Sequence, residues 1–355
     1  MSQTIPTTQK AIIVDDSGNF VESSNVPVMQ LEPDAVIIKV AAVALNPVDT
    51  KMLGDFATPG AILGFDCAGT VVAVGRDVGA RLKPGDRVCG SADGMNRFRP
   101  LSGGFAEYVS LPGDLALKIP EGMSFEAAAP LGTALASAGM ALFASLKLPA
   151  TLTEPASAPF WVLVNGGSTS TGTMMIQLLK LCNLRVVTTC SPRNFALVKS
   201  YGADAVFDYN SPTCAQDIRK FTEDALEYAV DCVTLESSMK LCYAAIGRAG
   251  GSYTALDPFP ETQRTRKAIT PDWILATQVT GNACSWPAPY GRDGSPELRA
   301  WANTFFEQVQ KALNERRIRG HPAKVSPDGF AGVLEGVGII RRGEVSGQKL
   351  VYSVA

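Results

Sequence analysis

Short, β-branched apolar runs separated by Gly, Pro, Asn and Asp make up the amino-terminal part of the chain. The runs are AIIV at 11–14, AVIIKVAAVAL at 35–45, AGTVVAVG at 68–75 and FAEYVSL at 105–111. Runs of this composition, bounded by turn residues, are typical of β-strands. The pattern predicts an all-β segment from Lys10 to Gly113.

The pattern changes at an alanine-rich stretch, 124–146. Its residues favour a helix, although Pro130 and Gly132 interrupt it, and we expect a helical connector. The segment 148–159 that follows is rich in Pro, Ala and Thr, which is typical of a surface loop or hinge. We therefore expect a domain boundary near residue 155.

Predicted strands and helices alternate beyond this boundary. Strands are expected at 160–165, 185–190, 205–209 and 228–233, with helices between them at 171–183, 191–202 and 211–224. Such alternation is typical of a doubly wound parallel sheet, the α/β class.

Two more strands are expected at 250–256 and 274–283, then a helix at 298–317 and a closing strand at 347–354. The predicted organisation has three parts. Residues 1–155 form a β-rich domain, residues 156–286 form an α/β domain, and residues 287–355 return to the first domain.

Composition and charge exclude several classes of protein. The 355 residues are 46% hydrophobic and 19% charged, a balance typical of a packed two-domain enzyme. A net charge of −2 without long runs of one sign lacks the pattern of a nucleic-acid-binding protein. We identify neither an apolar signal core nor an apolar stretch long enough to cross a bilayer, and we expect a cytoplasmic protein.

Cysteine and histidine usage limits the chemistry further. The eight cysteines contain no CxxC pair, so we expect reduced, buried thiols and no zinc knuckle or disulfide framework. The single histidine, His321, precedes Pro322 and fits a structural role better than that of a base or ligand. Mechanisms based on histidine are therefore not expected.

A glycine- and hydroxyl-rich turn follows the first strand of the alternating region. Residues 166–172 read GGSTSTG and precede a predicted helix, which places amides and hydroxyls at a helix amino terminus. By itself this turn is equally consistent with an ordinary turn and with a phosphate site. The repeated strand–helix context favours a dinucleotide pyrophosphate.

The end of the second strand indicates which dinucleotide is preferred. Enzymes that prefer NAD have an acidic residue there, which binds the ribose 2′-hydroxyl and repels a 2′-phosphate. This chain has Ser191 and Arg193 instead, and a hydroxyl with a guanidinium can hold a phosphate, so NADPH is favoured. Ser191 is alternatively a helix cap, and Tyr209, after the third strand, either closes over the same phosphate or only packs.

Several motifs, taken together, resemble the zinc-free, quinone-reductase-like branch of the medium-chain dehydrogenase/reductase superfamily. They span nearly the whole chain: NPVD at 46–49, LGFDCAGTVVAVG at 63–75, KPGDRV at 83–88, GGFAEY at 103–108 and the glycine-rich turn. The resemblance implies a GroES-like β-rich catalytic domain joined to a Rossmann cofactor domain.

The residues at the metal position depart from the zinc-dependent members of that superfamily. Those members have Cys where this chain has Asn46 and Gly-His-Glu where it has 64–66, and they carry a four-cysteine lobe that is missing here. Without thiolate and imidazole ligands we expect no metal. This disfavours alcohol dehydrogenation and leaves hydride addition to a conjugated alkene or a quinone.

A narrower set of motifs resembles the trans-acting enoyl reductases of fungal reducing polyketide synthases, of the lovastatin-pathway type. They are 45–52, FATP at 56–59, 166–171, CSPRNF at 190–195, AIGRAGG at 245–251 and WPAPYGR at 286–292. The resemblance implies hydride transfer from NADPH to the β-carbon of an α,β-unsaturated thioester. The thioester would be held on the acyl carrier protein of a partner synthase. The resemblance also implies a monomer.

The same resemblance implies catalytic roles for Lys51 and Ser137. Lys51 can bind the nicotinamide ribose and offset enolate charge, and Ser137 can donate to the carboxamide or to the substrate carbonyl. Without the resemblance Lys51 is equally an ordinary exposed lysine. At the position of Ser137 the family usually has threonine, and this chain has a threonine one helical turn earlier, Thr133. Phe56 has no hydroxyl where other enoyl reductases place a tyrosine, so the proton donor stays open.

Two longer sets follow from the resemblance. The residues implied along the cofactor are Val48, Asp49, Thr50, Lys51, Ser168, Thr169, Ser170, Thr171, Ser191, Pro192, Arg193, Asn194, Tyr209, Leu256, Asp257, Glu344 and Val345. The residues implied along the acyl chain are Ser137, Ala138, Gly139, Met140, Ala141, Ala144, Ala276, Thr277, Gln278, Val279 and Thr280. The second set is mostly small and apolar, which suits an uncharged tail but also ordinary core packing.

Two other functions remain open at this point. One is a small-molecule quinone or alkenal reductase that needs no carrier protein, because the same site would serve it. The other is a catalytically idle NADPH-binding scaffold. Turnover of a thioester, of a quinone or of neither distinguishes the three.

Overall fold

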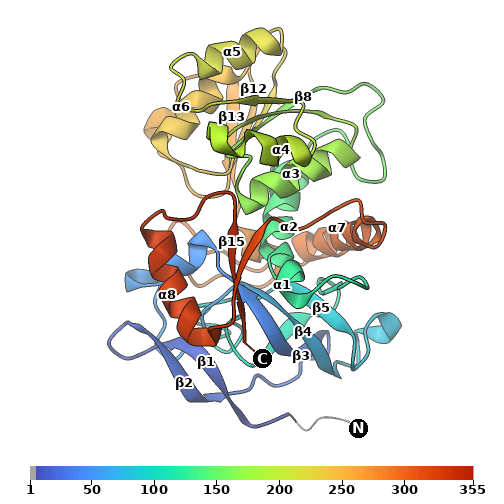
Figure 1. The fold of residues 1–355 in the computed structure, drawn as a ribbon, viewed down its shortest axis with the longest axis vertical. Coiled ribbons are helices and arrows are strands. Elements are labelled where there is room, and N and C mark those ends of the chain that lie inside the picture. The colour runs from blue at the N-terminus through green and yellow to red at the C-terminus, as the bar shows by residue number, and fades with distance from the viewer. Residues whose placement is uncertain (1–4, 355) are drawn as a thin grey trace. The chain divides into compact units, whose positions relative to one another are not determined.

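The computed structural model describes residues 5–354, which form two compact units (Figure 1). The first unit runs to Thr133 and resumes at Thr277, and the second comprises Ala134–Ala276. The second unit thus begins within the predicted helical connector, whereas the sequence analysis placed the boundary in the loop that follows it.

The first unit is built on a seven-stranded sheet with the order β14-β15-β3-β4-β5-β7, in which β6 also pairs with β3. A separate hairpin joins β1 and β2. The bounds are β1 Thr8–Val14, β2 Phe20–Pro27, β3 Ala35–Ala44, β4 Asp66–Val74, β5 Arg87–Ser91, β6 Tyr108–Pro112, β7 Leu117–Lys118, β14 Ala323–Ser326 and β15 Lys349–Ser353. The predicted β-rich character of Lys10 to Gly113 is confirmed, although three short 3-10 turns at 47–51, 54–56 and 79–81 interrupt the strands.

The carboxyl-terminal part of the chain completes this sheet. β14 and β15 are parallel and are joined by α8 (Gly329–Arg341), and β15 then pairs antiparallel with β3, with Val351 opposite Ala44. The other helical elements of the unit are η1 Pro47–Lys51, η2 Gly54–Phe56, η3 Gly79–Arg81, α1 Phe125–Ala128 and α7 Pro296–Asn314. β15, from the carboxyl-terminal part of the chain, therefore lies beside β3, the strand that ends just before η1.

Strands β3 and β4 approach very closely in the middle of this sheet. A Cβ atom at Gly69 on β4 would lie 2.2 Å from the carbonyl oxygen of Lys39 on β3. Val36, Ile38 and Val43 on β3 are completely buried. Glycine at position 69 therefore allows the backbone contact on which this core is built.

The second unit contains a six-stranded parallel sheet with the order β10-β9-β8-β11-β12-β13. Figure 1 shows α3 and α4 on one side of this sheet and α5 and α6 on the other. The bounds are β8 Trp161–Asn165, α3 Ser170–Leu181, β9 Arg185–Thr189, η5 Pro192–Asn194, α4 Phe195–Ser200, β10 Ala205–Phe207, α5 Cys214–Phe221, β11 Tyr228–Asp231, α6 Glu236–Ala245, β12 Gly251–Ala255, η6 Glu261–Gln263 and β13 Ile269–Trp273. The predicted doubly wound sheet, and with it the α/β class, is confirmed.

The strand predicted at 274–283 is wrong. The strand lies earlier, as β13, and residues Ala276–Thr280 form the 3-10 turn η7. The hydroxyl of Thr280 donates to the carbonyl of Thr277 at 2.8 Å, and the amide of Gly281 donates to Gln278 at 3.0 Å. Because these local bonds satisfy the backbone, they compete with a strand ladder.

The helical connector is broken where the sequence predicts. Helix α1 ends before Pro130, α2 spans Leu131–Gly139, and Met140–Ser145 continue as a π-helical turn, η4. The stretch Phe125–Ser145, with a mean hydropathy of 1.5, is long and apolar enough to cross a membrane, although no such stretch was expected from the sequence. However, 78% of its apolar window is buried inside the protein. Such burial is typical of the core helix of a folded domain.

Candidate functional site

The glycine-rich turn of the second unit leads from β8 into α3. Gly166 has φ +82°, which a residue with a side chain rarely adopts. A Cβ at Gly167 would lie 1.9 Å from Thr188 Oγ1, and one at Gly172 would lie 2.4 Å from the carbonyl of Gly166. The three glycines therefore let α3 begin directly against β8 and β9, which is the close packing that a dinucleotide pyrophosphate needs.

The amino terminus of α3 is arranged to bind an anion. Thr169 is the N-cap and accepts a hydrogen bond from the amide of Gly172 at 3.0 Å. The amides of Ser170 and Thr171 lie in the first turn, where no intrahelical acceptor exists. Ser168, Thr169, Ser170 and Thr171 are all partly exposed. The turn thus fits a pyrophosphate, with amides and hydroxyls together at the positive end of a helix.

The carboxyl end of β9 brings the predicted adenosine-side residues together. Ser191 Oγ and Tyr209 Oη lie 3.2 Å apart, although 18 positions separate them in the chain. Arg193 is exposed on η5, and Tyr209 is 49% exposed. β9 itself ends in Thr189 and not in a carboxylate. The hydroxyl pair and the guanidinium thus occupy the region where an NAD-preferring enzyme would have an acid.

A buried polar network, which the sequence analysis missed, lies below the glycine turn. Asp231 ends β11, is completely buried, and accepts from Asn165 Nδ2 at 2.9 Å, Ser238 Oγ at 2.6 Å and Tyr253 Oη at 3.0 Å. It also accepts from the amides of the loop that follows, at 2.9 and 3.1 Å. The signal in the sequence was a polar residue at the end of each of two apolar strands, Asn165 of β8 and Asp231 of β11. These strands are neighbours at the point where the strand order of the sheet reverses.

The first unit presents the turn η1, which carries the predicted residues Val48, Asp49, Thr50 and Lys51. Lys51 is exposed, whereas Asp49, two residues earlier, is completely buried. Asp49 Oδ2 accepts from the amide of Asn46 at 2.6 Å, and its Oδ1 has no hydrogen-bond partner. Burial, with a smaller contribution from Asp66, raises the pKa of Asp49 well above its usual range. The turn is therefore anchored from inside and presents Lys51 outward.

A buried ammonium group lies behind this turn, and the sequence analysis did not single it out. Lys349 Nζ donates to Asn46 Oδ1 and lies 3.4 Å from Asp66 Oδ2. Asn46 Nδ2 donates to the same oxygen of Asp66 at 2.9 Å. The side chain of Lys349 is 7% exposed and that of Asp66 is completely buried. No local sequence signal links position 349 to positions 46 and 66, because the pairing of β15 with β3 creates the contact.

These residues do not fit a catalytic zinc ion. Asn46 and Asp66, which stand at the positions of the Cys and the Glu in the metal motifs of zinc-dependent members, already bind an ammonium group, whose positive charge opposes a metal there. Cys67 and Cys89 are completely buried, and burial raises the pKa of both thiols. Within residues 5–354 no group of three or more His, Cys, Asp or Glu side chains could hold a metal ion.

The remaining predicted residues are divided between the units. Ser137 lies on α2 and is 7% exposed, and the rest of 138–144 continues through the π turn, largely buried. The 3-10 turn η7 carries Ala276–Thr280, and Thr277 Oγ1 is buried there without a hydrogen-bond partner. Leu256 and Asp257 follow β12 in the second unit, whereas Glu344 and Val345 follow α8 in the first. The hydroxyl of Thr133, the alternative to Ser137, lies 3.2 Å from Ser91 Oγ.

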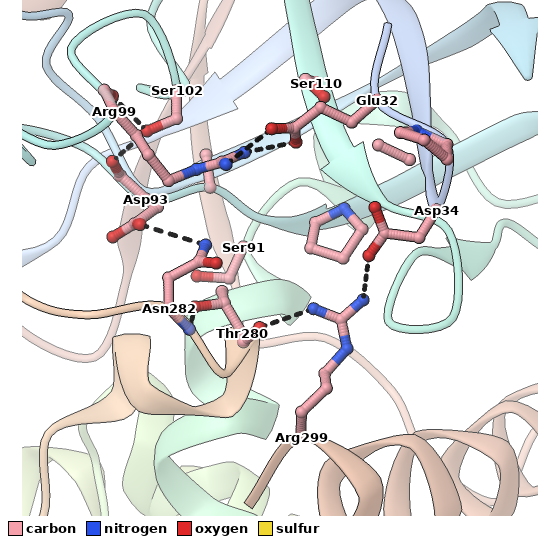
Figure 2. A pocket seen from close by; sticks show the side chains of 14 residues that line it. Glu32, Asp34, Ser91, Asp93, Arg99, Ser102, Ser110, Thr280, Asn282 and Arg299 are labelled. Carbon is pink, nitrogen blue, oxygen red and sulfur yellow. Dashed lines mark hydrogen bonds and ion pairs between the residues drawn. The ribbon is translucent and has the colours of Figure 1, made fainter. Parts of the chain in front are cut away.

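Figure 2 shows a polar cavity of about 180 Å³ that belongs entirely to the first unit. Arg99 binds Glu32 through two bonds of 2.7 and 2.5 Å, and Arg299 binds Asp114 and the carbonyl of Thr280. Burial raises the pKa of Asp93, also in this cavity, to about 6. Each arginine here is bound to a carboxylate, and Arg299 also links α7 to Thr280 at the end of η7.

All eight cysteines are free thiols, as predicted, and every one except Cys232 is buried. Burial raises the pKa of Cys190, Cys214 and Cys284 to about 11. These thiols are therefore protonated near neutral pH and serve as small apolar side chains.

The two units together define a nicotinamide-dependent oxidoreductase, and comparison with known proteins agrees. Residues 32–121 match the family model of the alcohol dehydrogenase GroES-like domain, and residues 170–256 match that of the zinc-binding dehydrogenases. The solved CurK enoyl reductase is similar in fold, with a TM-score of 0.76 at 18% identity over 99% of this chain and 100% of that one. A putative zinc-dependent alcohol dehydrogenase from Rhizobium etli has a TM-score of 0.79 at 22% identity, over 98% and 99% of the two chains.

Closer relatives are found among curated fungal proteins. The trans-enoyl reductase buaC of Petromyces alliaceus is 62% identical over 348 residues, which cover 98% of each chain. The trans-enoyl reductase caaB of Aspergillus niger is 48% identical over 99% of this chain and 98% of its own. The chain belongs to the trans-enoyl reductases of the medium-chain dehydrogenase/reductase family.

Proposed function

We propose that the protein is a trans-acting enoyl reductase. It would reduce an α,β-unsaturated polyketide thioester carried on the acyl carrier protein of a partner polyketide synthase. The observation that carries the proposal is the polar centre of the first unit, in which Asn46 stands where zinc-dependent members have a cysteine ligand and is bound by the ammonium group of Lys349. Such a site cannot activate an alcohol through a metal, but it suits hydride addition to a conjugated double bond. Curated relatives that cover almost the whole chain are named trans-enoyl reductases.

The cofactor that we propose is NADPH, which would supply the hydride. Three observations support the phosphorylated form. Ser191 and Tyr209 place two hydroxyls 3.2 Å apart, Arg193 adds an exposed guanidinium, and β9 ends without an acid. A phosphate dianion gains charge-assisted bonds from such groups, whereas a bare ribose would leave the guanidinium without its anion.

Lys51 and Ser137 are the proposed catalytic residues. Hydride addition to the β-carbon places negative charge on the thioester oxygen, so a donor or a cation near that oxygen lowers the barrier. Lys51, exposed at the end of η1, has the charge for this role. Ser137 would donate to the carbonyl or to the carboxamide. The proton for the α-carbon would come from solvent or from the substrate side, because Phe56 has no hydroxyl.

The acyl chain is proposed to run along 137–144 and 276–280. Ala144 and Ala276 are partly exposed and offer small, uncharged walls, whereas Ala138 and Ala141 have no exposed surface. A polyketide tail without charge fits walls of this kind better than it fits the polar cavity of Figure 2.

We also propose that the enzyme is a cytoplasmic monomer. β13 is an edge strand of the six-stranded sheet and carries Pro271, which has no amide proton to donate. A proline at this place weakens the pairing of the edge with a second copy.

The test is NADPH consumption, followed at 340 nm, with a 2-methyl-2-enoyl pantetheine thioester as substrate. A simple quinone serves as the competing substrate and NADH as the cofactor control. Turnover of the thioester alone, with NADPH, is the expected result. Turnover of the quinone would favour the small-molecule reductase, and tight NADPH binding without any turnover would favour the idle scaffold.

A further inference from the structure

Lys349 brings a buried positive charge to the centre of the first unit. It is the first residue of β15, its side chain is 7% exposed, and its amide donates to the carbonyl of Pro322 at 2.8 Å. Its Nζ faces two oxygens, Asn46 Oδ1 and Asp66 Oδ2, the latter at 3.4 Å. A buried ammonium group is strongly unfavourable unless such partners compensate it.

Asp66 links the ammonium group to two other parts of the unit. Its Oδ2 accepts from Asn46 Nδ2 at 2.9 Å, and its Oδ1 accepts from the amide of Thr133 at 2.7 Å. Asp66 therefore joins β4 to the residue before the catalytic turn and to the first turn of α2. Removing the ammonium group would leave this carboxylate buried without a cation.

Asn46 transmits the arrangement to the turn that carries Lys51. It lies immediately before η1, and its amide donates to Asp49 Oδ2 at 2.6 Å, while the amide of Asp49 donates back to the Asn46 carbonyl at 3.1 Å. Its side-chain amide is held at both ends, by Lys349 through the oxygen and by Asp66 through the nitrogen. The orientation of Asn46 is thus determined by the ion pair behind it.

We propose that Lys349 is a positioning residue, whose ammonium group is the buried cation of this site and orients the turn Pro47–Lys51 through Asn46 and Asp66. Lys349 acts through Lys51 and not on the substrate, because it is buried and bound to two partners. The inference rests on the function proposed above, in which Lys51 contributes to turnover.

The experiment compares the turnover of an enoyl pantetheine thioester by the full-length wild type and by the variants Lys349→Met, Lys349→Arg, Lys51→Ser and Lys51→Ser/Lys349→Met. We expect Lys349→Met to lower kcat by on the order of 10-fold to 100-fold, because small displacements of a catalytic group have such effects. In the Lys51→Ser background, Lys349→Met should lower kcat by less than about 2-fold, because the effects of two residues that act as one unit are not additive. Lys349→Arg should recover part of kcat, since it restores a cation.

Lys324→Met is the matched control. Lys324 is an exposed lysine on β14, the strand that pairs with β15, so the same change there tests the loss of a lysine without the loss of the buried cation. Its kcat should equal that of the wild type. The preference for NADPH over NADH should also stay within about 2-fold in Lys349→Met, because the groups proposed to bind the 2′-phosphate lie on the second unit.

A second variant separates positioning from stability. Lys349→Met/Asp66→Asn removes both charges, and removing a buried ion pair as a whole is much less destabilising than removing one partner. We expect the thermal unfolding temperature to recover toward the wild-type value while kcat stays low. Recovery of kcat together with stability would overturn the proposal, because Lys349 would then only stabilise the fold.

The outcomes separate this inference from the proposed function. Wild-type protein without turnover would overturn the proposed function and this inference with it. An active wild type whose kcat survives Lys349→Met would overturn the inference alone. The same holds if Lys349→Met costs as much in the Lys51→Ser background as in the wild type, since Lys349 would then act independently of Lys51.

Discussion

Opposite environments for neighbouring residues characterise the turn η1. Lys51 is exposed, whereas Asp49 is completely buried, and burial raises its pKa. One ammonium group, on Lys349, faces two carboxyl groups across this small region, since the charge of Lys349 acts on Asp49 as well as on Asp66. Asp66 is the carboxyl group that pairs with the ammonium group, whereas burial raises the pKa of Asp49 well above its usual range.

At the residue scale, the proposed 2′-phosphate site can be tested at Arg193. Arg193→Ala should raise the Kd of NADPH by on the order of 10-fold and change that of NADH much less, because only NADPH has a ribose 2′-phosphate for the guanidinium to bind. Fluorescence titration with each cofactor measures the two constants.

Lys199→Ala is the control for this measurement. Lys199 is an exposed cation on α4, the helix that directly follows η5. It should leave both constants unchanged. Equal losses for the two cofactors in Arg193→Ala would contradict the assignment of a phosphate site.

At the scale of elements, the second unit depends on how closely α3 packs against its sheet. The start of α3 is held by the cap at Thr169 and by glycines with no space for a side chain. At the other end of the unit, Ser145 of the π turn binds Thr254 at 2.7 Å and Asp272 at 2.6 Å, which attaches the connecting helix to β12 and β13. Both contacts join segments that are distant in the chain.

Gly167→Ala tests this packing. The new methyl group would lie 1.9 Å from Thr188 Oγ1, which is buried and donates to the carbonyl of Val164 at 2.6 Å. The free energy of unfolding should fall by about 1–3 kcal/mol, typical of an overpacked core. NADPH binding should weaken, because α3 must shift.

Gly167→Ala/Thr188→Ala is the rescue variant for this test, since it removes the hydroxyl that clashes. Chemical denaturation and cofactor titration on both variants give the result. A single variant as stable as the wild type would show that the glycine is not required for close packing.

At the scale of the whole molecule, stability depends on the distribution of buried ionisable groups. His321 is 6% exposed, and burial, with the charge of Lys349, lowers its pKa to about 4. The unfolded chain binds a proton below about pH 6.5, whereas the folded protein does not until about pH 4. Protonation of His321 therefore favours the unfolded state as the pH falls through this window.

This linkage predicts a loss of stability on acidification. Relative to neutral pH, His321 should cost roughly 3 kcal/mol of unfolding free energy at pH 4, with most of the change between pH 6 and pH 4. Asp93, whose pKa is raised to about 6, acts in the opposite direction, since the folded state holds its proton more tightly. The free energy of unfolding, measured between pH 6 and pH 4, should change less steeply with pH in His321→Asn than in the wild type.

Proton NMR gives a direct check, because the chain has a single histidine. The imidazole of His321 should titrate near pH 4 in the folded protein. A midpoint near 6.5 would contradict the burial argument.

Much of the architecture follows from the sequence because it depends on local physics. Strand–helix alternation predicts the parallel sheet, Pro130 predicts the break in the connector, and glycines 166, 167 and 172 predict a tight turn into α3. The absence of zinc ligands at positions 46 and 65 is also visible in the sequence alone. Each of these features depends on residues close together in the chain, where periodicity and backbone preferences act.

The tertiary structure decided what depends on residues far apart in the chain. The 3-10 turn at 276–280 replaced a predicted strand, because hydroxyl bonds and the pairing of β13 compete with an apolar pattern. The network of Asp231 and the ion pair of Lys349 with Asp66 appear only once β8 lies beside β11 and β15 beside β3. Because burial and pairing of charges are properties of the folded core, the sequence alone determined the class of this protein, and the fold decided which cation occupies its centre.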